Sequence, residues 1–244
     1  MLIRGRATGG FRGIHGGHGE ARNVRTSAVE TESPRGSKAS SRIGLSGSGR
    51  ARVPVEQVLD QRRSVRDFTS GALSLEQVSQ LLWACQGVTS EDGKRTAPSA
   101  GALYPLTIWL IARRITGVPE GVYRYDPRAE GLQTLKLGDF ADSVAEAAFG
   151  QRWIAGAPAI LAITAAISRT AARYGSRAER YVFIEAGHAA QNVYLQVQSL
   201  GLGTVIVGAF DDAAVANILS LPSGETPVAL MPVGWPDTVA VSAG

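Results

Sequence analysis

The sequence predicts an α+β fold, in which a sheet is flanked by helices, and three observations lead to this prediction. Strand-like apolar runs cluster in the middle of the chain and recur near its end. A long helix is expected over residues 177–200, and its narrow polar stripe predicts burial on most sides. Helices and strands do not alternate regularly, which argues against a doubly wound parallel sheet.

The helices are placed by apolar spacing and by capping residues. A capping box formed by Ser74 and Gln77 marks the start of the second helix, and Asp139 and Asp211 are suited to cap two others. Cys85, the single cysteine, falls on the apolar face of the second helix and is expected in the core. The predicted helices cover residues 54–62, 75–86, 139–149, 177–200 and 211–219.

The strands are placed by short apolar runs between turn residues. The second and third strands are joined by residues 126–131 and are expected to form a hairpin. Residues 87–104 are rich in Gly, Ser, Thr and Pro, which predicts a loop, and residues 166–178 carry no recognisable signature. The predicted strands cover residues 106–112, 121–125, 132–137, 158–164, 204–210 and 227–233.

The basic charge of the chain belongs to its first 50 residues. Residues 1–50 carry nine Lys or Arg and three Asp or Glu, whereas residues 51–244 carry 16 and 18. The first 50 residues also hold 11 of the 29 glycines and show no sustained period, so they are predicted to be a disordered basic Gly/Ser/Arg-rich tail before a folded domain at 51–244. Nucleic-acid binding is not expected of that domain, although an electrostatic role of the tail with RNA, membrane or an acidic partner stays open.

Several classes of protein are excluded by composition. No run approaches the roughly 18 consecutive apolar residues of a membrane helix, and the N-terminus lacks the apolar middle segment of a secretory signal, so a cytoplasmic protein is expected. One cysteine cannot form an internal disulfide or a multi-cysteine metal site, and no metal is expected. Redox chemistry would need an imported cofactor.

Two short motifs are candidates for binding phosphate. Arg62, Arg63, Ser64 and Arg66 gather guanidinium groups and a hydroxyl at the end of the first helix, which suits a phosphate, although such clusters are more often solvated surface. Residues 201–204 contain two glycines, but these end a helix and precede a strand, the reverse of the order in dinucleotide-binding folds. A helix C-cap is the preferred interpretation there.

The order and spacing of the motifs resemble the FMN-dependent nitroreductase superfamily. Residues 62–68 look like its N-terminal flavin-phosphate motif, and residues 201–210 look like the strand that lines the isoalloxazine ring. The resemblance spans residues 53–236. Three further segments are similar to its SagB-type dehydrogenase branch, namely residues 97–105, 180–192 and 232–236.

The resemblance implies an intertwined homodimer with a central, mostly antiparallel sheet and two FMN molecules at the subunit interface. A flavin would supply hydride chemistry, and the protein would position it. Members often add a Lys or Arg after the final strand, but residues 237–241 offer no cation. The residues implied to bind FMN are Arg62, Arg63, Ser64 and Arg66 near the phosphate and ribityl chain, Ser99, Ala100 and Gly101 from the partner chain, and the backbone of Val207, Gly208 and Ala209 at the ring.

The resemblance also implies candidate catalytic residues. The azoline dehydrogenases of the branch use a Lys–Tyr pair to deprotonate substrate, and its best counterpart is Arg173 with Tyr174. Arginine stays protonated, so it cannot replace lysine as a general base. Tyr174 could still act with Arg173 beside it, or the pair could belong to a plain surface loop. His188 is interpreted as a buried helix histidine paired to a neighbour.

The leading hypothesis from the sequence is an FMN-dependent oxidoreductase of the SagB type that oxidises thiazoline or oxazoline rings of a modified peptide to azoles. A cyclodehydratase complex would then be its partner. One alternative is an NAD(P)H-dependent nitro or quinone reductase that acts on small molecules. Another is a non-catalytic flavin-binding subunit of a biosynthetic complex. No membrane partner is expected.

Overall fold

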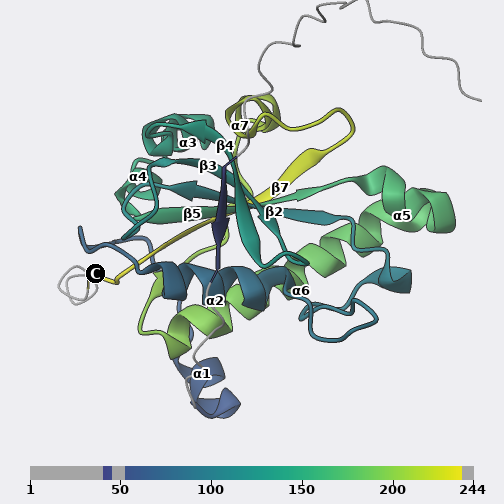
Figure 1. Ribbon diagram of the computed structural model, residues 1–244, viewed down its shortest axis with the longest axis horizontal. Coiled ribbons are helices and arrows are strands. Elements are labelled where there is room, and N and C mark those ends of the chain that lie inside the picture. Colours follow the sequence, from purple (N-terminus) through teal and green to yellow (C-terminus); the bar gives the residue numbers. More distant parts are fainter. Residues whose placement is uncertain (1–40, 46–52, 238–244) are drawn as a thin grey trace, which may run out of the picture. The chain divides into compact units, whose positions relative to one another are not determined.

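The described part of the chain, residues 41–45 and 53–237 of the computed structural model, is built on one seven-stranded sheet. The strand order is β1-β4-β3-β2-β5-β7-β6 (Figure 1), and every neighbouring pair is antiparallel. This confirms the predicted α+β class. The strands are β1 Arg42–Gly44, β2 Leu106–Ala112, β3 Gly121–Asp126, β4 Gly131–Leu137, β5 Ala159–Ala165, β6 Gly203–Thr204 and β7 Thr226–Gly234.

Helices cover both faces of the sheet (Figure 1). Along β2, Ile108 and Leu110 belong to the core shared with α2 and α6, whereas Trp109 and Ile111 belong to the core shared with α3, α4 and α7. Successive side chains of a strand point to opposite faces, so both faces of this sheet are buried. The helices are α1 Val55–Gln61, α2 Leu75–Gln86, α3 Ala141–Ala147, α4 Trp153–Gly156, α5 Ile167–Tyr174, α6 Ala178–Ser199 and α7 Asp212–Leu219, with short 3₁₀ turns η1 Ala100–Ala102 and η2 Gly175–Arg177.

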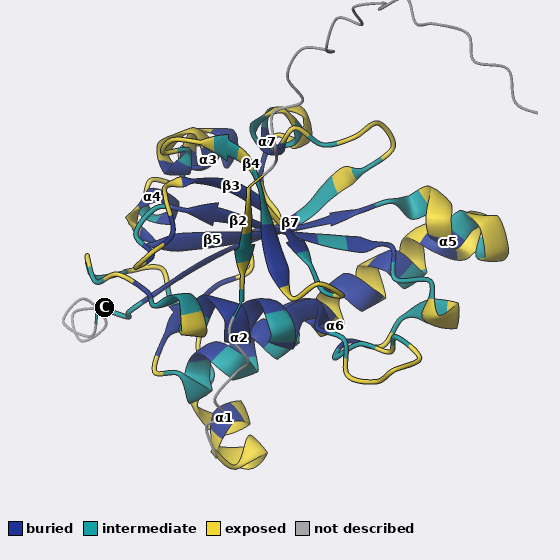
Figure 2. Cartoon of the chain, viewed as in Figure 1, coloured by how far each residue is buried: buried dark blue, intermediate teal, exposed yellow. Residues whose placement is uncertain are grey.

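Burial is unequal among the helices. The central strands and much of α2 are buried, whereas α1 and α5 expose large parts of their surface (Figure 2). None of the helices in the described residues is both long and apolar enough to cross a membrane.

The local signals read from the sequence are confirmed at several helix ends. Both hydrogen bonds of the Ser74–Gln77 capping box are present, and Asp211 caps α7 by accepting from the Ala214 N–H. Gly201 ends α6 with a φ of +69°, and the N–H of Leu202 donates to the Val197 carbonyl. This is a Schellman cap, as expected from a C-cap glycine.

Three expectations are corrected by the structure. β1 lies inside the predicted tail, so residues 41–45 belong to the folded part, while residues 1–40 and 46–50 lie outside the described residues. The strand predicted at 204–210 is reduced to β6, because beyond Thr204 the chain returns to the sheet only at a single bridge between Val207 and Leu230. α5 was not predicted, because few of its residues are apolar.

Candidate active site

The arginine motif after α1 lies against the segment that follows α6. Ser64 forms a parallel bridge with Thr204, and the Val65 N–H donates to the Thr204 carbonyl at 2.9 Å. Gly203 permits this approach, because a Cβ there would lie 2.7 Å from the Cβ of Val65. The structure therefore brings together the two segments that the sequence predicts to hold the flavin phosphate and the flavin ring.

Tyr194 of α6 joins these two segments. Its hydroxyl accepts a hydrogen bond from the Ile206 N–H at 2.9 Å and lies 3.2 Å from the Ser64 Oγ. The guanidinium of Arg62 covers its ring, with Cζ 5.2 Å from the ring centroid. Tyr194 was not predicted as a site residue, because in the sequence it is one aromatic residue on a largely apolar helix.

The three arginines of the motif point in different directions. Arg63 donates from Nη1 to the backbone carbonyls of Asp60 and Arg62 at 2.7 and 2.9 Å, so its guanidinium turns back on α1 and does not join the predicted phosphate site. Arg66 lies over Trp153, with Cζ 5.8 Å from the ring centroid. Within the described residues, neither Arg62 nor Arg66 forms an ion pair. Two guanidinium groups therefore remain for an anionic ligand, and their chemistry fits a flavin phosphate.

The backbone after β6 offers hydrogen-bond donors, but not where Val207 was predicted to supply one. The N–H and C=O of Val207 both pair with Leu230, at 2.8 and 2.9 Å, and its side chain is buried. Gly208 and Ala209 are exposed, and in the part of the chain that is described no group accepts from their N–H groups. Of the three residues predicted to face the flavin ring, only Gly208 and Ala209 therefore have a backbone N–H without an acceptor in the described residues.

The predicted flavin loop lies against the end of α5. Gly101 has a φ of +61°, and a Cβ there would lie 2.9 Å from both the Arg173 Nη1 and the Tyr174 Oη. The Tyr174 ring packs edge-on against Tyr181, with centroids 5.0 Å apart. The Arg173–Tyr174 pair therefore lies at a helix end beside Ser99–Gly101 and not in a loop.

A buried carboxylate supports this loop. Glu185 of α6 is 2% exposed, and it is hydrogen-bonded by the Ser99 hydroxyl and by the Gln86 amide at 3.4 Å. Burial raises the pKa of the Glu185 carboxyl. The Ser99 Oγ also accepts from the Tyr104 N–H at 2.9 Å, so one carboxylate and one hydroxyl fix the turn that carries Gly101.

The two halves of the predicted site contact different stretches of α6. Glu185 and Tyr194 are nine residues apart, which is about 13 Å along a helix axis. The interpretation of His188 as a buried histidine is wrong, because His188 is exposed, and the buried polar residue of this part of α6 is Glu185. Phe183 and Ile184 expose about half of their surface, 50% and 51%.

The sheet is antiparallel and buried on both faces, and the arginine motif pairs with the segment after β6. The chain belongs to the nitroreductase family, whose model matches residues 59–235. This membership makes an oxidoreductase the expected class of protein.

Two relatives are similar to this chain in sequence. A Methanocaldococcus jannaschii protein that is named as a nitroreductase is 48% identical over 182 residues, which are 75% of this chain and 91% of the relative. The trifolitoxin operon protein TfxC of Rhizobium leguminosarum bv. trifolii is 31% identical over 108 residues, which are 38% of this chain and 30% of the relative.

Solved structures share the fold. A Ralstonia eutropha protein named as a nitroreductase superimposes with a TM-score of 0.71 at 30% identity, covering 81% of this chain and 90% of that one. The Escherichia coli microcin synthetase McbBCD complex with truncated pro-MccB17 bound contains a chain similar at a TM-score of 0.64 and 21% identity, with 77% and 74% covered. The NADPH:FMN oxidoreductase of Vibrio harveyi complexed with NAD⁺ gives 0.55 and 21%, with 75% and 69% covered.

Proposed function

We propose that this protein is an FMN-dependent oxidoreductase. The observation that carries the proposal is the pairing of the arginine motif with the segment after β6, through Ser64 and Thr204. It joins the motif that carries Arg62 and Arg66 to the segment that leads to Gly208 and Ala209. In the described residues these two arginines have no ion pair and these two N–H groups have no acceptor. Bound FMN would supply the hydride chemistry.

Each of these residues has a distinct task in the proposal. Arg62 and Arg66 bind the phosphate by charge-assisted hydrogen bonds, and the Ser64 hydroxyl, held 3.2 Å from the Tyr194 hydroxyl, donates to the ribityl chain or phosphate. The N–H groups of Gly208 and Ala209 face the ring, where small side chains let the backbone approach.

We also propose that the protein is a homodimer. Exposed apolar side chains lie on two helices, Phe183 and Ile184 on α6 and Val55 and Leu59 on α1, and a partner would cover them. The loop Ser99–Gly101 contacts a different stretch of α6 from Tyr194, which fits a loop that borders the flavin of the other protomer.

For the reaction, we infer the oxidation of azoline rings in a modified peptide. The SagB-type motifs of the sequence, the similarity to part of TfxC and the position of Tyr174 beside Gly101 support it. Tyr174 would act as the base that takes the proton from the substrate carbon, and the Arg173 guanidinium lies beside it, with Cζ 5.5 Å from the Tyr174 ring centroid. A cyclodehydratase would supply the azoline substrate.

The cofactor is tested by the absorption spectrum of the purified protein after incubation with FMN and desalting. The wild type is expected to retain flavin, and the double variant Arg62→Ala/Arg66→Ala to lose it. Arg63→Ala is the matched control, because its guanidinium bonds to its own helix and should not affect flavin retention. A folded wild type that takes up no FMN would refute the proposal.

The reaction is tested with the flavin-loaded protein and two substrates. An azoline peptide should lose two hydrogens and consume an electron acceptor, and Tyr174→Phe should slow this without releasing flavin. Consumption of NAD(P)H with a nitroaromatic or quinone, and none of the peptide, would favour the reductase instead.

A further inference from the structure

The loop that carries Ser99 and Gly101 has a strained backbone. Gly101 has a φ of +61°, and Ala102 and Tyr104 have φ values of +54° and +47°. The left-handed region is costly for a residue with a side chain, above all for a bulky one. Such strain persists only where the surrounding structure holds it, and it gathers at functional sites. The contacts that hold this loop therefore determine where Gly101 lies.

Tyr104 is the residue through which the loop is fixed. Its N–H donates to the Ser99 Oγ at 2.9 Å, and its carbonyl accepts from the Arg169 Nη1 of α5 at 2.5 Å. The Arg95 guanidinium covers its ring, with Cζ 4.6 Å from the centroid, which is a cation–π contact. Tyr104 is thus held both by its backbone and by its ring.

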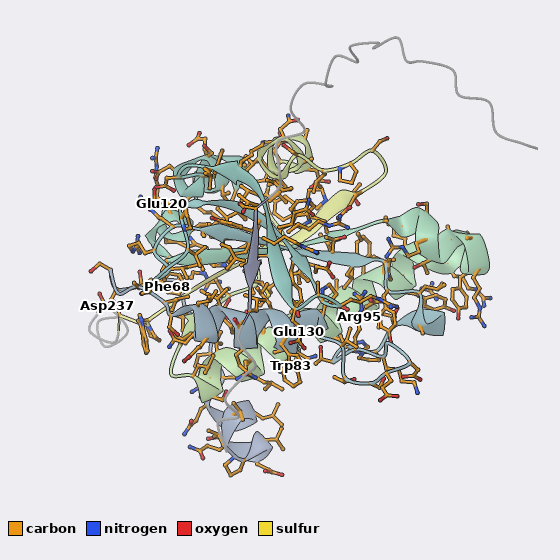
Figure 3. The ribbon with its side chains drawn as sticks, viewed as in Figure 1. Phe68, Trp83, Arg95, Glu120, Glu130 and Asp237 are labelled. Carbon is orange, nitrogen blue, oxygen red and sulfur yellow. The ribbon has the colours of Figure 1, made fainter. Side chains whose placement is uncertain are left out.

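Arg95, labelled in Figure 3, lies on the loop that follows α2 and is itself held in place. Its backbone forms an antiparallel bridge with Val88, and its Nη1 donates to the Gln86 Oε1 at 3.1 Å. Gln86 of α2 is 1% exposed and donates in turn to the Glu185 Oε1 of α6 at 3.4 Å. Burial lowers the pKa of the Arg95 guanidinium, and the Glu185 carboxylate opposes that shift. The side chain that covers Tyr104 is therefore anchored to two core helices.

Together these contacts form a closed cycle. It runs through Arg95, Gln86, Glu185, Ser99 and Tyr104, whose aromatic ring lies under Arg95 again. A connected polar network rigidifies the segment that it holds. Removal of the Arg95 side chain would open the cycle where it reaches the ring of Tyr104.

The loop also lies against the proposed base and its helix. A Cβ on Gly101 would lie 2.9 Å from the Tyr174 Oη and from the Arg173 Nη1, so the backbone there borders both groups. α5, which ends at Tyr174, supplies Arg169 to the Tyr104 carbonyl. A displacement of Tyr104 therefore changes how the loop meets Tyr174.

We propose that Arg95 is a positioning residue for the proposed reaction. Through the Tyr104 ring it holds the strained loop so that Gly101 stays beside the Tyr174 hydroxyl and the loop keeps its border with the flavin. A misplacement of about 1 Å can cost a reaction about 100-fold, so a side chain that fixes this loop controls the rate. The inference rests on the function proposed above and adds to it a residue that acts through others.

The first test compares Arg95→Ala with the wild type as full-length, flavin-loaded proteins. The variant should retain FMN, because Arg62 and Arg66 bind the phosphate in the proposal. Its kcat with an azoline peptide should fall about tenfold or more, with little change in KM. The absorption bands of its bound flavin should shift, because the loop borders the ring. Arg95→Lys keeps a cation for Tyr104 and should recover most of the rate.

A second measurement follows the loop directly and needs neither flavin nor substrate. In hydrogen–deuterium exchange, the peptide over residues 99–104 should exchange several-fold faster in Arg95→Ala, whereas peptides of β5 should be unchanged. Tyr104→Leu should have the same effect, and the double variant should be no worse than either single variant, because both changes remove one contact. Lys94→Ala is the matched control, because its ammonium pairs with Asp92 of the same loop at 2.8 Å; it should behave as the wild type does.

The proposal is overturned if residues 99–104 of Arg95→Ala exchange as in the wild type, if its flavin-loaded form keeps the wild-type kcat, or if the effects of Arg95→Ala and Tyr104→Leu add. Failure of the proposed function gives a different result. A wild type that takes up no FMN, or that takes it up and leaves the azoline peptide unchanged, refutes that function, and the exchange of residues 99–104 still decides whether Arg95 holds the loop.

Discussion

Replacing Tyr194 by phenylalanine should loosen the junction between the arginine motif and the segment after β6. The change keeps the ring under Arg62 but removes a hydroxyl that accepts from the Ile206 N–H at 2.9 Å and bonds to the Ser64 Oγ at 3.2 Å. Each neutral hydrogen bond contributes about 0.5–1.5 kcal/mol, so the free energy of unfolding should fall by about 1–3 kcal/mol. In a chain of this size that lowers Tm by about 2–4 °C per kcal/mol.

The assay is urea unfolding of the wild type, Tyr194→Phe, Ser64→Ala and the double variant. Because Ser64 and Tyr194 share a hydrogen bond, the sum of the losses of unfolding free energy in the two single variants should exceed the loss in the double variant by about 1 kcal/mol. Tyr181→Phe is the matched control, because Tyr181 lies on the same helix and makes a ring contact but has no hydroxyl partner in the described residues. A Tyr194→Phe protein as stable as Tyr181→Phe, with no coupling to Ser64, would show that the junction does not depend on this hydroxyl.

Three further predictions follow from groups around the loop and the core. Glu185 holds its proton more tightly in the folded than in the unfolded chain, so its contribution to stability falls as pH rises past its unfolded pKa near 4.5. Measured by urea unfolding, Glu185→Gln should therefore gain stability relative to wild type as the pH rises above about 4.5. A difference between the two proteins that does not change with pH would contradict this. Gly101→Ala should destabilise by about 1 kcal/mol because of the positive φ, whereas Gly44→Ala, with nothing within 4 Å of the new Cβ, should be close to neutral; equal melting temperatures would count against strain at Gly101. Burial raises the pKa of Cys85 to about 12, so a thiol reagent at about pH 8 should label it only as fast as the protein opens, and immediate labelling of folded protein would place the thiol outside the core.

Local chemistry explains which parts of the fold were predictable. Helix caps could be predicted because their hydrogen bonds join residues a few positions apart in the sequence. The examples are the capping box at Ser74, the cap at Asp211 and the glycine after α6. α5 is only eight residues long, is polar on average and contacts α6, so no apolar run marks it in the sequence. β1 pairs with β4, with Ile43 opposite Leu132. This pairing could not be predicted, because no local sequence pattern identifies a strand partner so far away in the chain.

The candidate site was predicted only to the level of segments. The family resemblance named two segments that the structure brings together at Ser64 and Thr204. Side-chain direction depends on tertiary contacts that spacing does not encode. The Arg63 guanidinium donates to the Asp60 carbonyl, and the Val207 N–H donates to the Leu230 carbonyl. Tyr194 and Glu185 acquire their roles from partners far away in the sequence, Ser64 and Ser99, so neither could be chosen from the helix alone.

The bridge between Ser64 and Thr204 has a consequence for the order of events during synthesis. Residue 64 must wait for residue 204 before the proposed flavin site exists. The segment around Phe68 pairs later still, with Pro236, the neighbour of Asp237, which Figure 3 labels near Phe68. Closing so long a loop is entropically costly and slow. While the ribosome is still extending the chain, α2 and the β3–β4 hairpin can form, but the proposed cofactor site is not yet assembled. Flavin capture is therefore expected to be a late event that reports on completion of the whole sheet, and it cannot serve as a template for the early stages of folding.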